Sequence, residues 1–372
     1  MEDIKERLRR LKEDGRRLLG CFPLYPPVEL FHGLGLNPLV MWGLGPFFPR
    51  THKSDQHLQD FVCSVGRHLT EFVLSHAGRM LDGLFFYNAC DTLRNLPEIL
   101  QSGLTEEGRH LPSFNVHIPM PARKQTDGSQ YLRDEIDALT ERLEDAFGVR
   151  LSRARFEESV ALHSRARELA KRLERRVAEG RWSFTRFTGL MQGNCFRAVE
   201  GQIEVMTSAL TRIETNGEAV PEAPCVGRVI LSGILPPPES ISSVMEEAGL
   251  RVVGNDIASL ARTYAYTPEA CASPADYYVD FYYRHHPCTT LLGTADQRAC
   301  TLESLVEEWD AQGVIFLGEK YCEYEYFEFP HLQKRLGAKG VKTLLLEFAV
   351  DADRSLGAYK TRIEAFAEML GS

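Results

Sequence analysis

Three cysteines stand where an α/β protein could present a thiolate to a ligand. Cys90 follows the apolar run Gly83–Asn88, and Cys322 follows a similar run that begins at Gly313. Both runs are typical of buried strands, and open parallel sheets bind their ligands beyond the carboxyl ends of the strands. Cys63 lies in or beside a predicted helix. A helix N-terminus that follows such a cysteine favours the thiolate over the thiol.

Spacing alone leaves the role of these cysteines open. Strand position alone favours a small buried apolar residue over a ligand at each of these places. The intervals between Cys63, Cys90 and Cys322 match no zinc ribbon or ferredoxin motif, since those motifs use close pairs such as C-x-x-C. Nine cysteines, an odd number without a secretion signal, do not indicate a disulfide framework. Any shared metal site must therefore be assembled by the fold.

The segments around these cysteines alternate between strand and helix patterns. Helical spacing of apolar residues predicts an N-terminal helix over 1–19 and a helix over 55–76 with Ser54 as its N-cap. Further helices are expected at 239–248, 301–312, 330–336 and 358–370, and strands at 38–42, 83–88, 226–235, 251–254, 313–317 and 343–350. Such alternation predicts doubly wound parallel sheets.

The domain organisation follows from one long helical stretch. Residues 130–215 are rich in Glu, Arg, Leu and Ala with helical periodicity and contain hardly any strand pattern. We expect an N-terminal helix at 1–20, a first α/β domain at 21–125, a helical segment at 126–222 and a second α/β domain at 223–372. The segments Asp82–Asp91 and Gln312–Glu323 share the order polar residue, glycine, apolar strand, cysteine, acid. The two α/β halves are therefore expected to present a cysteine at matching places.

Composition excludes several classes of protein. The net charge of −9 over 372 residues argues against a general nucleic-acid binder. No run approaches the roughly 18 apolar residues that a membrane span requires, and the charged N-terminus lacks the apolar core of a signal peptide. A cytoplasmic protein is expected. There is no P-loop, no H-E-x-x-H motif and no G-x-S-x-G elbow.

Taken together, four segments resemble the 2-hydroxyacyl-CoA dehydratase and benzoyl-CoA reductase family. They are Phe61–Ser64, Gly83–Leu96, Gly313–Glu323 and Thr361–Glu368. Shorter supporting matches are Pro27–Leu30, Asn255–Asp256 with Arg262, Pro287–Cys288 and Asp296–Arg298. The resemblance covers nearly the whole chain.

The resemblance implies flavodoxin-like domains and an iron–sulfur site. Members pair two related subunits, each with a [4Fe-4S] cluster on three cysteines, matched here by Cys63, Cys90 and Cys322. It further implies an acyl-CoA substrate, radical loss of water, a homologous partner subunit or a second copy, and an ATP-dependent iron–sulfur activator. Residues that could line a substrate pocket are Glu29, Arg94, Asp256, Arg262 and Arg298. Taken in isolation, charged pairs such as Asp256 with Arg262 are also compatible with ordinary surface ion pairs.

Several alternatives remain within the resemblance. A reductase subunit of the benzoyl-CoA type is one, and a relative with a double-cubane [8Fe-9S] cluster is another. Cys21 and Cys288 fall near places of additional cluster ligands, but Asp256 stands where a further cysteine is expected. An accessory electron-transfer subunit that never touches substrate, or a member without a cluster, would also be compatible with the sequence.

Overall fold

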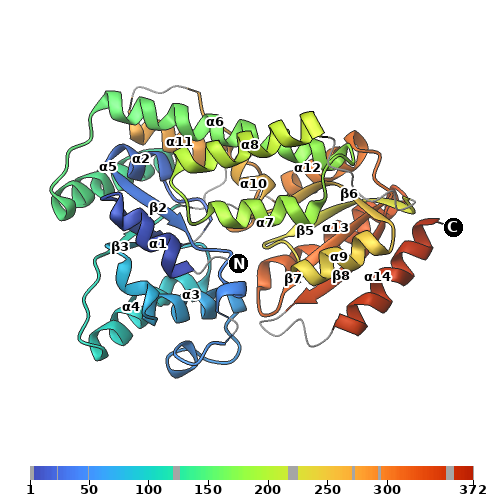
Figure 1. Ribbon diagram of the computed structural model, residues 1–372, viewed down its shortest axis with the longest axis horizontal. Helices are drawn as coiled ribbons and strands as arrows, with labels where there is room; N and C mark the ends of the chain where they lie inside the picture. Colours follow the sequence, from blue (N-terminus) through green and yellow to red (C-terminus); the bar gives the residue numbers. More distant parts are fainter. Residues whose placement is uncertain are drawn as a thin grey trace.

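The chain folds around two parallel four-stranded sheets (Figure 1). The computed structural model describes residues 4–22, 24–48, 50–119, 126–216, 225–269, 273–291, 295–348 and 356–371. The strand orders are β2-β1-β3-β4 and β6-β5-β7-β8, so each sheet places its first strand between its second and third. This repeated order confirms the prediction of an α/β protein with two parallel-sheet halves.

The N-terminal half carries the first sheet. Its strands are β1 (Arg17–Cys21), β2 (Leu36–Val40), β3 (Gly83–Tyr87) and β4 (Ser113–Val116). Its helices are α1 (Ile4–Glu13), α2 (Val28–Gly33), α3 (Ser64–Leu74) and α4 (Asp91–Glu106), with short 3-10 turns η1 (Gly45–Phe47), η2 (Ser54–Gln56) and η3 (Ala77–Met80). Every residue of β3 is buried, as its apolar sequence predicts.

The C-terminal half carries the second sheet. Its strands are β5 (Gly227–Gly233), β6 (Leu250–Ile257), β7 (Gly313–Glu319) and β8 (Lys342–Phe348). Its helices are α9 (Glu239–Glu247), α10 (Ala261–Tyr264), α11 (Pro274–Arg284), α12 (Ala295–Glu308), α13 (Glu323–Ala338) and α14 (Leu356–Gly371). β7 is the counterpart of β3 in the strand order, and it too is buried throughout.

A layer of helices runs across both halves (Figure 1). It consists of α5 (Thr126–Phe147), α6 (Arg153–Ala178), α7 (Phe184–Asn194) and α8 (Val199–Asn216). The described residues from 126 to 216 contain no strand, as the sequence predicts. Helix α6 links the two halves, because Phe156 near its start packs in the core of the first half and Leu173 packs in the core of the second.

Helix α11 returns from the C-terminal half to the N-terminal one. Its Tyr277, Tyr278 and Tyr282 are buried in the apolar core that also contains β1 and β3. In Figure 1 this helix lies beside α5 and α6, away from the second sheet. The predicted domain boundaries at 125/126 and 222/223 fall at or within the segments 120–125 and 217–224, which lie outside the described residues.

The structure corrects two predicted helices. The first helix ends at Glu13, and Leu18 belongs to strand β1 because a turn at Gly15, with φ +74°, redirects the chain. The second helix begins only at Ser64, and Ser54 instead begins a 3-10 turn. Phe61, which fits the helical spacing, is 67% exposed. The described part of the chain holds no helix long and apolar enough to cross a membrane.

Candidate functional site

The three cysteines singled out by sequence cap three different helices. Cys63 is the N-cap of α3, Cys90 of α4 and Cys322 of α13. Cys90 and Cys322 each stand three residues after a strand, β3 and β7, as predicted. All three side chains are partly buried against the same apolar core. The repeated fold therefore places thiols from both halves at the junction between them.

These thiols influence one another electrostatically. The pKa of Cys63 is raised to about 12, mainly by burial and in smaller part by the nearby charges of Glu319 and Cys90. Burial also raises the pKa of Cys322 well above its usual value, with Cys63 and Cys90 among the contributing neighbours. The thiols are therefore protonated in the metal-free chain, and a bound metal would displace their protons.

At two of the cysteines, nearby backbone N–H groups lower the pKa of the thiol and so oppose the effect of burial. The backbone N–H groups of Val65 and Gly66 lie close enough to the thiol to offset part of the effect of burial on the pKa of Cys63. Burial raises the pKa of Cys90 as well, and the backbone N–H groups of Leu93 and Thr92 oppose this. Helix N-termini thus direct backbone N–H groups and partial positive charge toward these two sulfur atoms, which favours thiolate ligands.

Thiols are the donor type that holds iron–sulfur clusters in proteins. Within the described ranges, no three His, Cys, Asp or Glu side chains are grouped to hold one ion. In a cluster each cysteine binds a different iron, so the ligands lie farther apart than those of one ion. All three thiols lie at helix N-termini, where backbone N–H groups could donate hydrogen bonds to the sulfur atoms of a cluster.

Two hydrogen bonds connect the halves right beside the cysteines. The Ser64 hydroxyl, one residue after Cys63, donates to the Glu319 carboxyl group at the end of β7. The Tyr324 hydroxyl, two residues after Cys322, donates to the Ala89 carbonyl oxygen at 2.5 Å. We call this pair of bonds the interhalf clasp. It connects the start of α3 to the end of β7, and the residues just before α4 to the first turn of α13.

The backbone before Cys322 adopts a conformation that bulky residues rarely take. Tyr321 has φ +68°, in the left-handed region, which costs an L-residue about 1–2 kcal/mol. The backbone N–H of Cys322 donates to the Glu319 carbonyl oxygen at 2.8 Å, which closes the turn. The tight turn allows Cys322 to cap α13 immediately after β7 ends. Such strain persists where the surrounding structure holds it in place.

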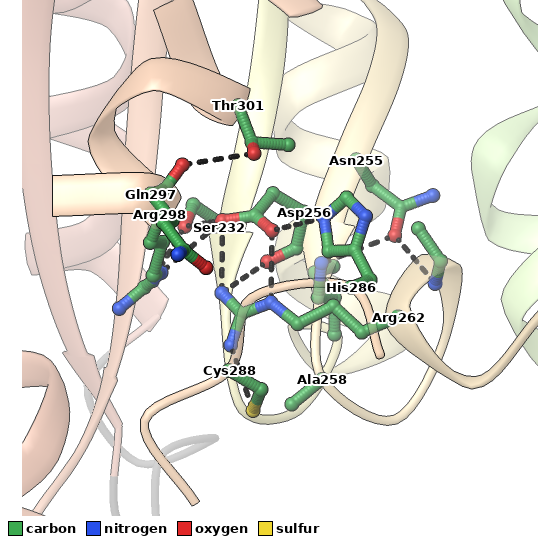
Figure 2. Close-up of polar contacts among 12 residues, drawn as sticks. Ser232, Asn255, Asp256, Ala258, Arg262, His286, Cys288, Gln297, Arg298 and Thr301 are labelled. Carbon is green, nitrogen blue, oxygen red and sulfur yellow. Dashed lines mark hydrogen bonds and ion pairs between the residues drawn. The ribbon is translucent and has the colours of Figure 1, made fainter. Parts of the chain in front are cut away.

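Three of the predicted pocket residues meet in a buried charged network (Figure 2). Asp256, near the end of β6, accepts hydrogen bonds from Arg262 Nε and Nη2, each at 2.8 Å. Ser232 Oγ donates to Asp256 at 2.9 Å, and Arg298 Nε and His286 Nε2 lie 3.4 Å from its carboxylate. Burial alone would raise the pKa of Asp256, but Arg262 and the other donors hold it well below its usual value.

This network extends to the helix that Cys322 caps. Arg298 donates to Glu325 in the first turn of α13 at 3.1 Å, and it also pairs with Glu328. At the other end, Arg262 Nη1 donates to Cys288 Sγ at 3.3 Å. Arg262 and Arg298 are at most 1% exposed, so the reading of these residues as surface ion pairs is wrong.

Glu29 is not part of that network. It lies on α2, where it is buried and ion-paired with Arg167 of α6. Tyr277 and Tyr278 of α11 donate to its two oxygens at 3.0 and 2.7 Å. Burial would raise the pKa of Glu29, but Arg167 and these hydrogen bonds lower it to about 2. With both oxygens occupied, Glu29 joins three helices instead of facing the cysteines.

Arg94 remains at the surface of α4. Its guanidinium group lies 3.4 Å from Asp91, and both side chains are exposed. It is nevertheless close enough to Cys90 for its positive charge to lower the pKa of that thiol slightly against the effect of burial. The structure therefore places Arg94 at the outer rim of the cysteine site.

The cysteines proposed as additional ligands do not fit a larger cluster. Cys21 is fully buried at the end of β1, where its thiol contacts the Leu19 carbonyl oxygen at 3.4 Å. Cys288 Sγ accepts hydrogen bonds from Arg262 and from Tyr25, the latter at 3.2 Å. Asp256, at the place of the expected extra cysteine, is engaged by Arg262. A double-cubane cluster would have to displace this packed ionic network.

Sequence reasoning missed the residues of the clasp. Ser64 and Tyr324 lie next to or near predicted cysteines, and Glu319 lies two residues after the predicted strand 313–317, so the sequence places all three near the site. Their pairing was not, because it joins positions more than 200 residues apart. Arg167 was missed for the same reason, since nothing in a long helical pattern separates it from the exposed arginines around it.

The fold and this site define a two-half α/β protein with helix-capping cysteines at its junction. The chain belongs to the family described as "2-hydroxyglutaryl-CoA dehydratase, D-component", whose profile matches residues 23–370. It is 26% identical over 370 residues to the (R)-phenyllactyl-CoA dehydratase beta subunit of Clostridium sporogenes, covering 98% of this chain and 94% of that protein.

Two further relatives have different substrates in their names. The chain is 24% identical over 376 residues to the beta subunit of the (R)-2-hydroxyglutaryl-CoA dehydratase of Acidaminococcus fermentans, covering 98% of this chain and 96% of that protein. It is also 24% identical over 344 residues to a benzoyl-CoA reductase subunit of Thauera aromatica, covering 91% and 86% of the two chains. The family thus includes subunits of both dehydratases and reductases.

Proposed function

We propose that this chain is the iron–sulfur subunit of a 2-hydroxyacyl-CoA dehydratase, with Cys63, Cys90 and Cys322 each binding one iron of a [4Fe-4S] cluster. The observation that carries the proposal is the placement of these thiols as N-caps of three helices at the junction of the two halves. Family membership and the dehydratase names of the relatives support the substrate class.

A cluster on three thiolates would supply one open iron as a Lewis acid and a site for a single low-potential electron. The chain's own residues provide the surroundings. Partial burial limits the access of water to the thiols, and the N–H groups of Val65, Gly66, Thr92 and Leu93 stabilise negative charge on sulfur. The clasp from Ser64 and Tyr324 keeps the ligands from both halves in register.

A benzoyl-CoA-reductase-type subunit is the second candidate, favoured by the match to the Thauera aromatica reductase. Both candidates use the same cysteines, so the site does not separate them. In either case the relatives are named as single subunits of larger enzymes, which supports a partner subunit for this chain. A homologous partner and an ATP-hydrolysing iron–sulfur activator complete the proposal. An accessory role, in which only the partner holds the thioester, is a third arrangement.

Cysteine-to-serine variants test the cluster ligands. After anaerobic purification with the partner, we expect about four irons per chain in the parent and a clear loss of iron in Cys63→Ser, Cys90→Ser and Cys322→Ser, because serine is a poor ligand for iron in clusters. Cys225→Ser is the matched control, since that cysteine is exposed. Full iron retention in the triple serine variant would show that these residues are not the ligands.

Thioester titrations separate the candidate functions. We expect a 2-hydroxyacyl-CoA to perturb the electron paramagnetic resonance signal of the reduced complex and to be converted to the enoyl-CoA when the activator and ATP are present. Reduction of benzoyl-CoA under the same conditions would instead identify the reductase. If the thioester binds to the complex but leaves this subunit's signal unchanged, the accessory role is correct.

A further inference from the structure

The first two turns of α13, which directly follow Cys322, dock through a carboxylate. Glu325, at 3% exposed, is the one fully buried residue of these turns, whereas Phe327 beside it is 76% exposed. Apolar packing of the helix begins only at Phe329, whose ring meets that of Phe316 on β7 edge-on, with the ring centres 5.1 Å apart. A helix normally docks through an apolar face. The part of α13 nearest Cys322 therefore depends on polar contacts for its position.

Pro330 separates these turns from the rest of α13. Proline has no backbone N–H, so the carbonyl oxygen of Tyr326, four residues earlier, loses its usual donor within the helix. A proline inside a helix also makes bending at that point easier. The buried residues beyond it, Leu332 and Leu336, are thus weakly coupled to the start of the helix. Side-chain contacts before Pro330 have the larger influence on where Cys322 lies.

Arg298 of α12 makes these contacts, and its guanidinium group binds three elements at once. Nη2 donates to Glu325 at 3.1 Å and to Ser232 near the end of β5 at 3.0 Å, and Nη1 donates to Glu328. Nε lies 3.4 Å from Asp256 near the end of β6, and Figure 2 shows this strand side of the contacts. Glu325 and Glu328 are three residues apart, so they share one face of α13. Arg298, at 1% exposed, ties that face to the ends of two strands.

We propose that Arg298 is a positioning residue for Cys322, which fixes the first turns of α13 and thereby the place of this thiol among the three cysteines. It acts through Glu325 and Glu328, which follow the thiol on the same helix. The interhalf clasp fixes the same turns from the N-terminal half through Tyr324, and Arg298 fixes them from the C-terminal half. The consequence for a cluster rests on the proposed function, but the placement of the thiol is measurable in the metal-free chain.

Glu328→Gln tests the link between Arg298 and α13 with little risk to folding, because glutamine keeps the shape of the side chain. In the metal-free chain, Cys322 should be alkylated about three- to tenfold faster than in the parent, since the loss of a charged hydrogen bond favours local opening. Glu303→Gln is the matched control. Glu303 joins the same two helices through Arg335, farther along α13, and its side chain is 11% exposed against 12% for Glu328. This control should match the parent when the labelled peptides are quantified by mass spectrometry.

Arg298→Met removes the link completely, and Cys322 should then be alkylated at least about tenfold faster. Arg262→Met is the control for burial: Arg262 is 0% exposed and pairs with Asp256, but among the described residues it donates to none on α13. Both variants should unfold at lower urea concentration, yet only Arg298→Met should expose Cys322. Arg298→Lys keeps the charge but lacks the planar fork of donors, so its rate should fall between those of Arg298→Met and the parent.

The iron-loaded complex gives a second measurement. Because Cys322 would be held less firmly, Glu328→Gln should release iron to a chelator several-fold faster than Glu303→Gln. The electron paramagnetic resonance spectrum of the reduced cluster should also change in Glu328→Gln and match the parent in Glu303→Gln. A residue that only stabilised the C-terminal half would leave both measurements unchanged.

The variants distinguish failure of this role from failure of the proposed function. Parent-like alkylation of Cys322 in both Glu328→Gln and Arg298→Lys would overturn the role of Arg298, even if Arg298→Met does not fold. Equal alkylation in Arg298→Met and Arg262→Met would overturn it too, because the network would then only stabilise the C-terminal half. Faster alkylation of Cys322 together with full iron content in Cys322→Ser would support the positioning role and show instead that Cys322 is not a cluster ligand.

Discussion

At the scale of single residues, buried carboxylates in this chain take opposite charge states according to their partners. Glu29 and Asp256 each face an arginine, which holds their pKa values low against the effect of burial. Glu174 on α6 has no such partner; burial raises its pKa to about 7, although hydrogen bonds with Tyr264 and Asn255 oppose this. Ion pairing and burial therefore produce pH effects of opposite sign.

Glu174→Gln should flatten part of the pH dependence of stability. In the unfolded chain Glu174 loses its proton near pH 4.5, but in the folded chain only near pH 7. The stability that the protonated Glu174 side chain gives the folded state is fully present below pH 4.5 and is lost as the pH rises to about 7. Relative to the parent, the variant should therefore lose about 2–3 kcal/mol less unfolding free energy between pH 4.5 and 7.5. Urea denaturation at both pH values measures this difference.

The matched control for this prediction is Glu364→Gln, which changes an exposed carboxylate on α14. That variant should follow the parent's pH dependence. If Glu174→Gln also follows the parent, the carboxyl group is ionised in the folded protein at neutral pH and the argument from burial fails.

At the scale of elements, the helices that present the cysteines are held together across the halves by the interhalf clasp. A cluster would link the same elements covalently, whereas in the metal-free chain packing and these hydrogen bonds connect the starts of α3 and α4 to the end of β7 and the start of α13. Each hydrogen bond contributes about 0.5–1.5 kcal/mol. Its removal should therefore loosen the cysteine site before it affects the rest of the fold.

Ser64→Ala and Tyr324→Phe test the clasp. In the metal-free protein we expect Cys63 and Cys90 to be alkylated several-fold faster in these variants, because local opening of the junction exposes the buried thiols. Tyr326→Phe is the matched control on the same helix: its hydroxyl donates to Glu347, within the C-terminal half, at 2.7 Å. Equal alkylation rates in Tyr324→Phe and Tyr326→Phe would mean that the clasp does not position the thiols.

The elements also show how far the sequence could predict the fold. Strands β3 and β7 are long apolar runs after a glycine, and both were predicted. Strand β4, with four alternating residues, and helix α11, whose aromatic residues pack into the opposite half, were not. Local patterns report burial but not the partner that causes it. For this reason the cysteines could be predicted and the clasp could not.

At the scale of the whole molecule, the two halves repeat one strand order and are joined by helices that cross between them. Helix α6 spans both cores, and α11 returns to the first. Glu29 lies where α2, α6 and α11 meet, since its partners are Arg167, Tyr277 and Tyr278. This junction joins the N-terminal half, the helical layer and the C-terminal half in one buried network.

Arg167→Met should therefore destabilise the whole molecule. It leaves the Glu29 carboxylate buried without its cation, which typically costs 3–5 kcal/mol. Glu29→Gln combined with Arg167→Met removes the stranded charge and should recover at least half of that loss. Urea denaturation of the two variants measures both effects. Arg153→Met is the control, because the Arg153–Glu157 pair at 2.7 Å is exposed and such pairs contribute at most about 1 kcal/mol. If Arg167→Met proves no more destabilising than Arg153→Met, the Glu29 network does not hold the halves together.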